Sequence, residues 1–312
     1  MMAAEVRRTA LTLILMTAVI SGVSNFVNFW AVRGTNSDAF VAARNLAAGA
    51  ALAAGFFVVA QPKPWTLRPK DWARLAIVGL IGGAIPFALF FRGLAITGSS
   101  ATASFVYRAL FLVALVPAVV VFRERPSKRL VVGGFAMLAG NALLLSLVAP
   151  GWDLGATLVL LATILWTAEY SLSKWLLRDL PSGAVGAARM GFGGLFLLAW
   201  VAISGQLGAM TTLTPPQWQW AIVSTVLVVG FVATWYAGLA HVELSKATAL
   251  LTIAFPITFA LAVVFGAQPW TARQAAGAAI VVFGVLLAVG FRTIRDSIRE
   301  AILTAAGAAR RA

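Results

Sequence analysis

The tripeptide Ala42-Ala43-Arg44, inside an apolar run, recurs about 145 residues later as Ala187-Ala188-Arg189. Two further matches keep this spacing. Gly93-Leu94-Ala95 returns as Gly238-Leu239-Ala240, and with a shift of one residue the pair Gly133 and Gly140 returns as Gly277 and Gly284. Ala and Gly are abundant here, so each match alone is weak. Their common order and offset indicate an internal repeat, with units at residues 1–150 and 151–292.

The composition of the chain excludes a soluble protein. Of 312 residues, 61% are hydrophobic and 11% are charged, and the mean hydropathy is +0.92. A soluble domain carries about 25% charged residues, so this chain cannot cover a globule with a wettable surface. It has no Cys, which excludes disulfides and thiolate metal sites. We therefore predict a polytopic membrane protein.

Ten apolar runs are long enough to cross a bilayer, which takes about 20 residues of helix. Backbone groups in lipid must be satisfied within the segment, and the runs lack the alternation of barrel strands, so each is predicted to be a helix. The predicted spans are 10–31, 39–60, 72–95, 99–121, 129–148, 155–174, 185–204, 218–240, 246–266 and 273–291.

The basic residues separate between the two sides of the membrane. With the N-terminus inside, eighteen Lys and Arg residues fall on inner segments, whereas the outer connections hold only Arg33 and Arg273. The positive-inside rule then places both termini in the cytoplasm, in an inner (plasma) membrane. Topology explains the net charge of +14, so no nucleic acid partner is expected. Residues 293–312 are predicted to form a basic amphipathic tail on the cytoplasmic leaflet.

Each unit of the repeat contains five spans. Because five is odd, the second copy enters the membrane from the opposite side, as in many secondary transporters. The fold class that follows is an all-α membrane protein of ten helices, arranged as two inverted five-helix repeats around a central cavity. Exchange of conformations between the two halves would open that cavity alternately to each side.

Several motifs resemble those of the drug/metabolite transporter superfamily, in particular its EamA-type members. They are Ser21-Gly22-Val23-Ser24-Asn25-Phe26, Glu124-Arg125 with Gly133, Ala162…Trp166…Tyr170, and Ala247-Thr248-Ala249-Leu250-Leu251…Pro256. Within the superfamily the chain is similar to YddG-type exporters of aromatic and other neutral amino acids. The resemblance implies export of amino acids or similar amphipathic metabolites by alternating access. Gln268 stands where the second half would repeat Glu124, which departs from the family pattern.

Ionisable residues within the spans are costly and therefore candidates for function. Arg108 lies about 14 Å into the fourth span, where a substrate carboxylate or a structural partner would compensate it. Arg44 and Arg189 lie closer to helix ends and are expected to reach the interface. Glu169 is the single acid inside a span. It is expected to bind an ammonium group or a proton, or to pair at the interface with Lys174 or Arg178.

Aromatic and amide side chains are the other candidates for recognising a zwitterion with an apolar side chain. Trp166 lies nearer the middle of its span than the interfacial Trp residues do, and it is suited to a cation–π contact with an ammonium group. Asn25 is either a cavity wall or a hydrogen bond between helices. The remaining candidates are Asn28, Tyr107, Tyr170, Trp235 and Tyr236.

Helix breakers mark candidate hinges at Gly82, Gly83, Pro86, Pro117, Gly230 and Pro256. The alternative for each is an ordinary membrane-helix Gly or Pro, because both residues are common there and small residues permit close helix packing.

Other classes of membrane protein remain as alternatives. A channel would show a continuous polar stripe, and a membrane enzyme would need clustered acids or His; neither pattern is present. A facilitative uniporter, an exporter of other substrates, a lipid scramblase and a structural bundle remain open. The scarcity of intramembrane acids argues against a dedicated proton relay. The expected partners are an amino acid-like substrate and lipid, with no cofactor or metal. A monomer is expected, with a homodimer as the alternative.

Overall fold

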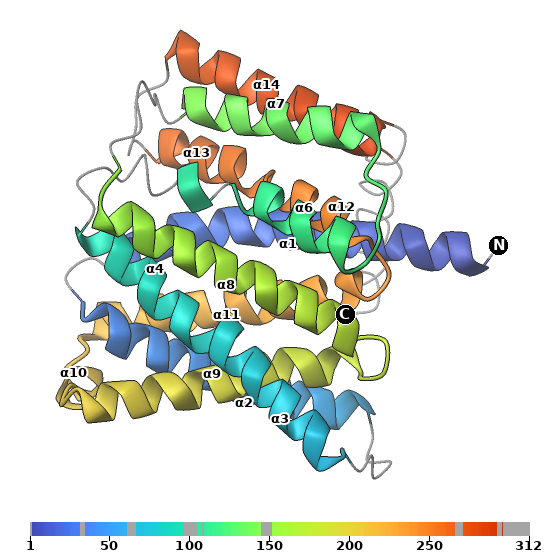
Figure 1. Ribbon diagram of the computed structural model, residues 1–312. Coiled ribbons are helices and arrows are strands. Elements are labelled where there is room, and N and C mark those ends of the chain that lie inside the picture. The colour runs from blue at the N-terminus through green and yellow to red at the C-terminus, as the bar shows by residue number, and fades with distance from the viewer. Residues whose placement is uncertain are drawn as a thin grey trace, which may run out of the picture.

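Helices make up all regular structure in the part of the chain that the structure describes (Figure 1). This computed structural model describes residues 2–31, 35–60, 67–96, 105–107, 109–144, 152–265, 271–291 and 295. The all-α prediction is therefore confirmed for these residues.

The helices of the first half overlap the five predicted spans, although α1 starts before its span and α6 covers only the second part of its own. They are α1 (Met2–Ala31), α2 (Ser37–Ala60), α3 (Pro69–Val78), the π-helix η1 (Gly79–Ala84), α4 (Ile85–Ile96), α6 (Leu110–Val120) and α7 (Lys128–Leu144).

The second half begins with two long helices. Its helices are α8 (Leu154–Leu176), α9 (Ser182–Ile203), the short α10 (Gly208–Thr211), α11 (Pro215–Leu239), α12 (Leu244–Leu251), α13 (Ala254–Val264) and α14 (Ala272–Val289).

Polar residues fix where several helices start. The Asp153 carboxylate accepts a hydrogen bond from the Ala156 amide at 2.7 Å at the beginning of α8. Thr271 and Gln274 form a reciprocal capping box at the beginning of α14. Such caps satisfy amide groups that lack a partner within the helix, so these two helices begin where the polar residues interrupt the apolar pattern.

Among the described residues, eight stretches are long and apolar enough to cross a membrane. They correspond to the predicted spans one to three and six to ten. The helix α6 has 11 residues and α7 has 17; these two shorter helices lie in predicted spans four and five. The count of ten spans remains a prediction.

The helices pack mainly in pairs: α2 with α9, α7 with α14, α1 with α11, and α4 with α8 (Figure 1). Glycines bring α7 and α14 into backbone contact. A Cβ atom placed on Gly140 would lie 2.6 Å from the Gly277 carbonyl oxygen, and one on Gly284 would lie 2.6 Å from that of Gly133. The four glycines of the repeat therefore face one another across a single interface, as small residues commonly do in membrane bundles.

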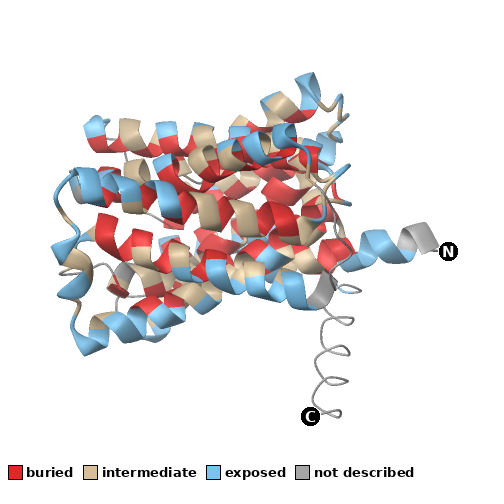
Figure 2. Ribbon diagram, turned by 90° about the horizontal axis from the view of Figure 1, so that it is seen from below, coloured by how far each residue is buried: buried red, intermediate tan, exposed pale blue. Residues whose placement is uncertain are grey.

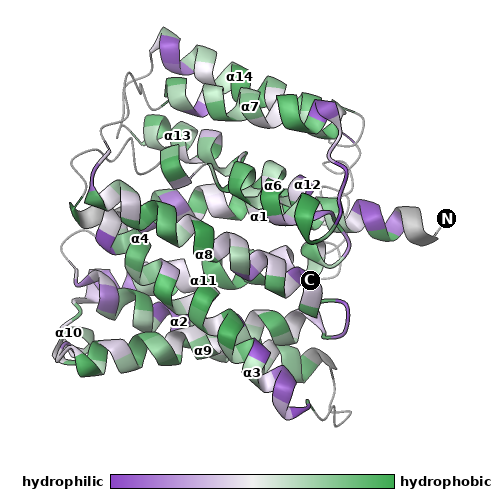
Figure 3. Cartoon of the chain, in the orientation of Figure 1, coloured by the Kyte–Doolittle hydropathy of each residue, from purple (hydrophilic) through white to green (hydrophobic). Residues whose placement is uncertain are grey.

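The distribution of side chains is that of a membrane bundle. Large apolar side chains lie on the outside, with Ile203 84%, Val58 77% and Val264 76% exposed. Figure 2 shows the buried residues gathered between the helices, and Figure 3 shows many of the hydrophilic residues near helix ends and connections. The polar groups that do lie inside, such as Asn45 and Glu169, are fully buried. The outer face is thus suited to lipid.

Three predicted spans are interrupted. In the third, η1 contains Gly82 and Gly83, and Pro86 follows in the first turn of α4. In the ninth, a turn at residues 252–253 separates α12 from α13, and Pro256 lies in the first turn of α13. In the fourth, α6 begins only at Leu110.

The helices continue through Pro117 and Gly230, and their role as hinges stays a prediction. α6 contains Pro117, and the Pro117 carbonyl still accepts the Val121 amide at 2.9 Å. α11 likewise continues through Gly230, whose carbonyl also accepts the Thr234 hydroxyl at 2.8 Å. Packing against neighbouring helices outweighs the preferences of single residues at these positions.

Candidate functional site

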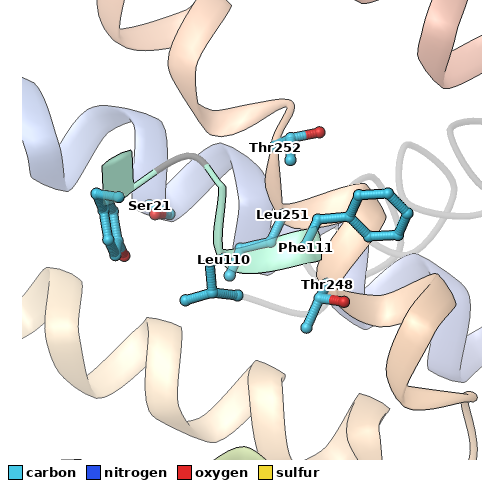
Figure 4. Close-up of a pocket in the computed structure, with 7 residues that line it drawn as sticks. Ser21, Leu110, Phe111, Thr248, Leu251 and Thr252 are labelled. Carbon is cyan, nitrogen blue, oxygen red and sulfur yellow. The ribbon is translucent and has the colours of Figure 1, made fainter. Parts of the chain in front are cut away.

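A small pocket lies where two interrupted spans meet, at the beginning of α6 and the end of α12 (Figure 4). Its free volume is about 20 Å³, which is room for about one water molecule. Four of its seven residues carry hydroxyl groups and the other three are apolar. The lining residues are Ser21, Tyr107, Leu110, Phe111, Thr248, Leu251 and Thr252.

Beside this pocket stands a cluster of four aromatic side chains, which we call the aromatic wall: Phe87, Phe90, Tyr107 and Trp166. The Tyr107 and Trp166 ring centroids are 5.3 Å apart, and the Trp166 ring lies 5.4 Å from Phe90 and 5.3 Å from Phe87. Edge-on and tilted rings at these distances attract one another. The wall joins α4, α8 and the residues before α6.

The indole of Trp166 is fixed by the π-helix. Its Nε1 donates a hydrogen bond to the Gly82 carbonyl at 3.1 Å. A π-helix frees carbonyl groups that an α-helix would use internally. This bond orients the ring within the wall, so Trp166 lies at the junction of η1 and α8, where the sequence places a candidate binding residue.

Glu169, one turn after Trp166, forms a buried polar cluster with Ser173 of its own helix and with residues of two other helices, α9 and α11. The Ser173 hydroxyl and the Tyr236 hydroxyl both donate to its Oε1 at 2.5 Å, and its Oε2 lies 3.4 Å from Arg189 Nε. The residue is 0% exposed. A side chain at Gly82 would exclude it, because a Cβ there would come within 2.8 Å of Glu169 Cδ.

Glu169 does not pair with Lys174 or Arg178, so that alternative is wrong, whereas its binding of an ammonium group or a proton stays a prediction. Lys174 instead donates to the Leu239 and Val242 carbonyls at 2.8 and 2.7 Å. Arg178 lies over the Phe122 ring, 5.8 Å from its centroid. Both cations point away from Glu169 toward the helix ends, whereas Arg189 on the adjacent helix faces it.

Arg44 and Arg189 do not reach the membrane interface, contrary to expectation, because each is only 2% exposed. Arg44 donates through Nε and one terminal nitrogen to the Asn45 amide oxygen at 3.0 and 2.9 Å. Asn45 in turn donates to the Gly83 carbonyl at 2.9 Å. The close crossing of α2, η1 and α9 holds both guanidinium groups inside the bundle.

The other predicted residues are distributed as follows. Tyr170 and Trp235 pack together with centroids 4.6 Å apart, and Trp235 Nε1 is buried without a hydrogen-bond partner among the described residues. Asn28 accepts from Ser224 at 2.6 Å and joins α1 to α11. The Asn25 amide nitrogen is buried and has no partner among the residues described. Arg108 lies outside the described residues.

Glu124 performs a helix-end role. Its carboxylate accepts the Leu244 amide at 2.7 Å, and from Ser245 it accepts both the amide at 3.0 Å and the hydroxyl at 2.6 Å. A carboxylate at a helix N-terminus satisfies free amide groups and interacts favourably with the positive end of the helix dipole. The first half of the chain thereby caps α12 in the second half. Its counterpart Gln268 falls outside the described residues.

The predicted residues Tyr107, Trp166, Glu169 and Tyr236 lie in two adjoining clusters, and their role in binding stays a prediction. Sequence reasoning missed the buried roles of Arg44, Asn45 and Arg189. The repeated Ala-Ala-Arg motif was the signal for both arginines, but distance from a helix end was a poor guide to burial. Among the described residues there is no group of His, Asp and Glu suited to a metal ion.

Comparison with known proteins agrees with this arrangement. A solved crystal structure, described only as that of a protein, superposes with a TM-score of 0.75 at 19% identity, over 89% of this chain and 97% of its own. At that identity the likeness shows a shared fold. No curated protein matches the chain.

The model of the EamA-like transporter family matches residues 8–146 and again residues 153–290. The two matches together account for most of the 312 residues. Members of this family are multi-pass membrane transporters of the drug/metabolite superfamily rather than enzymes. The chain therefore belongs to the EamA-like transporter family.

Proposed function

We propose that the protein is a secondary transporter that exports neutral amino acids, aromatic ones above all, by alternating access. One observation carries this proposal: the pocket between the interrupted fourth and ninth spans lies against the aromatic wall. Interrupted helices near the centre of a membrane bundle are typical of substrate sites in transporters. The hydroxyl groups of the pocket suit the polar end of an amino acid, and the aromatic rings suit an apolar side chain.

The repeat supports a site at this place. At the offset of the Ala-Ala-Arg motif, Tyr107 in the fourth span corresponds to Thr252 in the ninth, and both line the pocket. The family model matching each half separately is also in keeping with two related units. A pocket built from equivalent segments of two inverted units lies near their axis, where exchange of conformations alternates its access.

The size of the pocket supports a carrier over a channel. With room for about one water molecule, the pocket is too small for an amino acid. Substrate entry then requires rearrangement of the surrounding helices, and η1 with the α12–α13 turn provides two places where the regular helix is already interrupted. A channel would instead need a continuous wetted path.

The test is flux into liposomes containing the purified protein. Labelled L-phenylalanine, L-tryptophan, L-leucine and L-glutamate are supplied with and without a pH gradient. We expect saturable uptake of the neutral amino acids, competed by one another. Uptake linear in concentration would indicate a channel, and no uptake of any neutral amino acid would contradict the proposed substrate class.

The Trp166→Ala variant links the flux to the site. Loss of the indole removes one face of the wall, so we expect the KM for phenylalanine to rise at least about tenfold, equivalent to about 1.4 kcal/mol. Trp175→Ala is the matched control, because Trp175 lies on the same helix and is 38% exposed. An unchanged KM in Trp166→Ala would remove the residue from the site.

A further inference from the structure

The two arginines of the repeated Ala-Ala-Arg motif have different partners. Arg189 faces the carboxylate of Glu169, with 3.4 Å between Nε and Oε2. Arg44 donates both of its hydrogen bonds to one uncharged acceptor, the Asn45 amide oxygen. Within the described residues no carboxylate lies within ion-pair distance of Arg44. At the offset of the repeat, the residue that corresponds to Glu169 is Ser24, so the first half lacks the acid.

Among the described residues, the crossing of α2, η1 and α9 buries two guanidinium groups and one carboxylate, an excess of one positive charge. Arg44 and Arg189 are each 2% exposed and Glu169 is 0% exposed. A buried charge without a counter-ion is costly, whereas a hydrogen-bonded ion pair offsets much of that cost. The burial of the Arg44 charge is thus explained if an anion binds to it during the transport cycle. One surplus charge matches a single carboxylate rather than a dianionic phosphate.

We infer that Arg44 is the residue that binds the carboxylate of the transported substrate. This inference rests on the proposed function and names the anchor for the substrate's acidic group. A guanidinium group is well suited to the role, because its planar fork binds both oxygens of a carboxylate.

The aromatic wall connects Arg44 with the pocket. The Arg44 guanidinium lies over the Phe87 ring, 4.9 Å from its centroid. Phe87 contacts Trp166 edge-on, and Trp166 contacts Tyr107, which lines the pocket. An aromatic amino acid that displaces these rings would lay its apolar part along the wall and reach Arg44 with its carboxylate.

The π-helix places Arg44 where movement can expose it. Asn45, the partner of Arg44, is bound to the Gly83 carbonyl, and Trp166 is bound to the Gly82 carbonyl. Asn45, beside Arg44, and Trp166, in the aromatic wall, are thus both held by neighbouring carbonyl groups of η1. A return of η1 to regular α-helix would withdraw these acceptors and release Asn45 and Trp166 together.

The inference is tested with three ligands that share a phenyl ring: L-phenylalanine, 3-phenylpropionate, which lacks the ammonium group, and 2-phenylethylamine, which lacks the carboxylate. Each is titrated against the full-length protein in detergent, with binding followed by tryptophan fluorescence. The native protein should bind the first two and bind the amine at least about tenfold more weakly. Arg44→Met should reduce affinity for both carboxylates at least about tenfold, and Arg44→Lys should retain part of it. Arg92→Gln is the control, because the Arg92 side chain is 44% exposed and pairs with Asp38 away from Arg44.

A stability measurement separates binding from a structural role. If Arg44 awaits a ligand, Arg44→Met without ligand should melt no lower than the native protein, because it removes an unpaired buried charge. Arg189→Met should melt lower, because it leaves Glu169 unpaired.

A lower melting temperature for Arg44→Met together with unchanged affinity for 3-phenylpropionate would make Arg44 structural and overturn the inference. Equal binding of the amine and the acid would also overturn it. Saturable phenylalanine flux that persists in Arg44→Met with unchanged KM would leave the transport function intact and refute only the anchor.

Discussion

Glu169 connects more of the bundle than any other acid whose contacts are described above. It lies on α8, binds Arg189 on α9 and Tyr236 on α11, and packs against Gly82 in η1. A fully buried carboxylate is tolerable only because three polar side chains surround it. Trp166 and Tyr170 lie next to Glu169 on α8, and both make aromatic contacts. A change at Glu169 would therefore also shift the packing of the aromatic wall.

Replacement of Glu169 by Leu should be strongly destabilising. It leaves the Arg189 guanidinium buried without a counter-ion, which costs about 3–5 kcal/mol in comparable pairs. The double variant Glu169→Leu/Arg189→Met should recover most of the loss, because an apolar pair of similar size replaces the ion pair. Melting curves in detergent measure both. Glu243→Ala, an exposed acid at the beginning of α12, is the control, and failure of the double variant to recover would contradict this account.

The residues of the candidate site could be predicted from the sequence in part. Trp166 was identified because it lies away from a helix end, and Glu169 because an acid within a span is rare; both lie in the interior. The partner of Glu169 could not be predicted, since nearness in sequence favoured Lys174 and only the packing of α8 on α9 brings Arg189 to it. The burial of Arg44 likewise depends on how closely α2, η1 and α9 cross.

At the scale of helices, the sequence located the elements well because a long apolar run admits few alternatives in lipid. It located interruptions less well. Gly82 and Gly83 predict a weak point in the helix, and a π-helix forms there. Its freed carbonyl groups accept hydrogen bonds from the Trp166 and Asn45 side chains. α6 continues through Pro117, although proline has no amide group to donate to the preceding turn. Interruptions depend on neighbouring helices that local sequence does not describe.

The α7–α14 contact gives a prediction at this scale. Gly140→Ala should destabilise the protein by about 1–3 kcal/mol, the usual cost of overpacking, because the new Cβ would meet the Gly277 carbonyl oxygen at 2.6 Å. The matched control is Gly55→Ala in α2, where a Cβ meets nothing within 4 Å; there Ala should be neutral or stabilising. Thermal melting of the two variants in the same detergent provides the comparison, and equal effects would contradict the packing argument.

At the scale of the whole molecule, the helix pairs are those expected of two inverted units. Under the repeat, the α1–α11 pair corresponds to the α8–α4 pair, while α2–α9 and α7–α14 each correspond to themselves. The glycine contacts are reciprocal in the same way, Gly140 with Gly277 and Gly133 with Gly284. These relations support the repeat that the sequence predicts, although the side chains have diverged, as Glu169 and Ser24 illustrate. The helix pairs are arranged symmetrically, but the buried charges of the two halves differ. Arg44 of the first half would then be available for the substrate's carboxylate, whereas Arg189 of the second half is paired with Glu169.

The orientation of this frame in the membrane follows from charge. In Figure 1 the connections between α6 and α7 and between α8 and α9 lie at the same end as the N-terminus. That end carries basic residues such as Arg123, Arg125 and Arg178, so the positive-inside rule predicts that it faces the cytoplasm. The connection after α9 is then predicted to face outward, and the proposed export runs from the basic end toward that side.

Because the chain has no Cys, single cysteines report this orientation without background. Ser127→Cys lies in the α6–α7 connection and Ser204→Cys directly follows α9, and both positions are exposed. In intact spheroplasts a membrane-impermeant maleimide should label Ser204→Cys at once and Ser127→Cys only after permeabilisation. The reverse labelling pattern would contradict the predicted topology. The proposed direction of transport would then be import rather than export. Equal labelling of both sites in intact cells would mean that the chain inserts in two orientations, in which case the excess of basic residues at one end does not decide its direction.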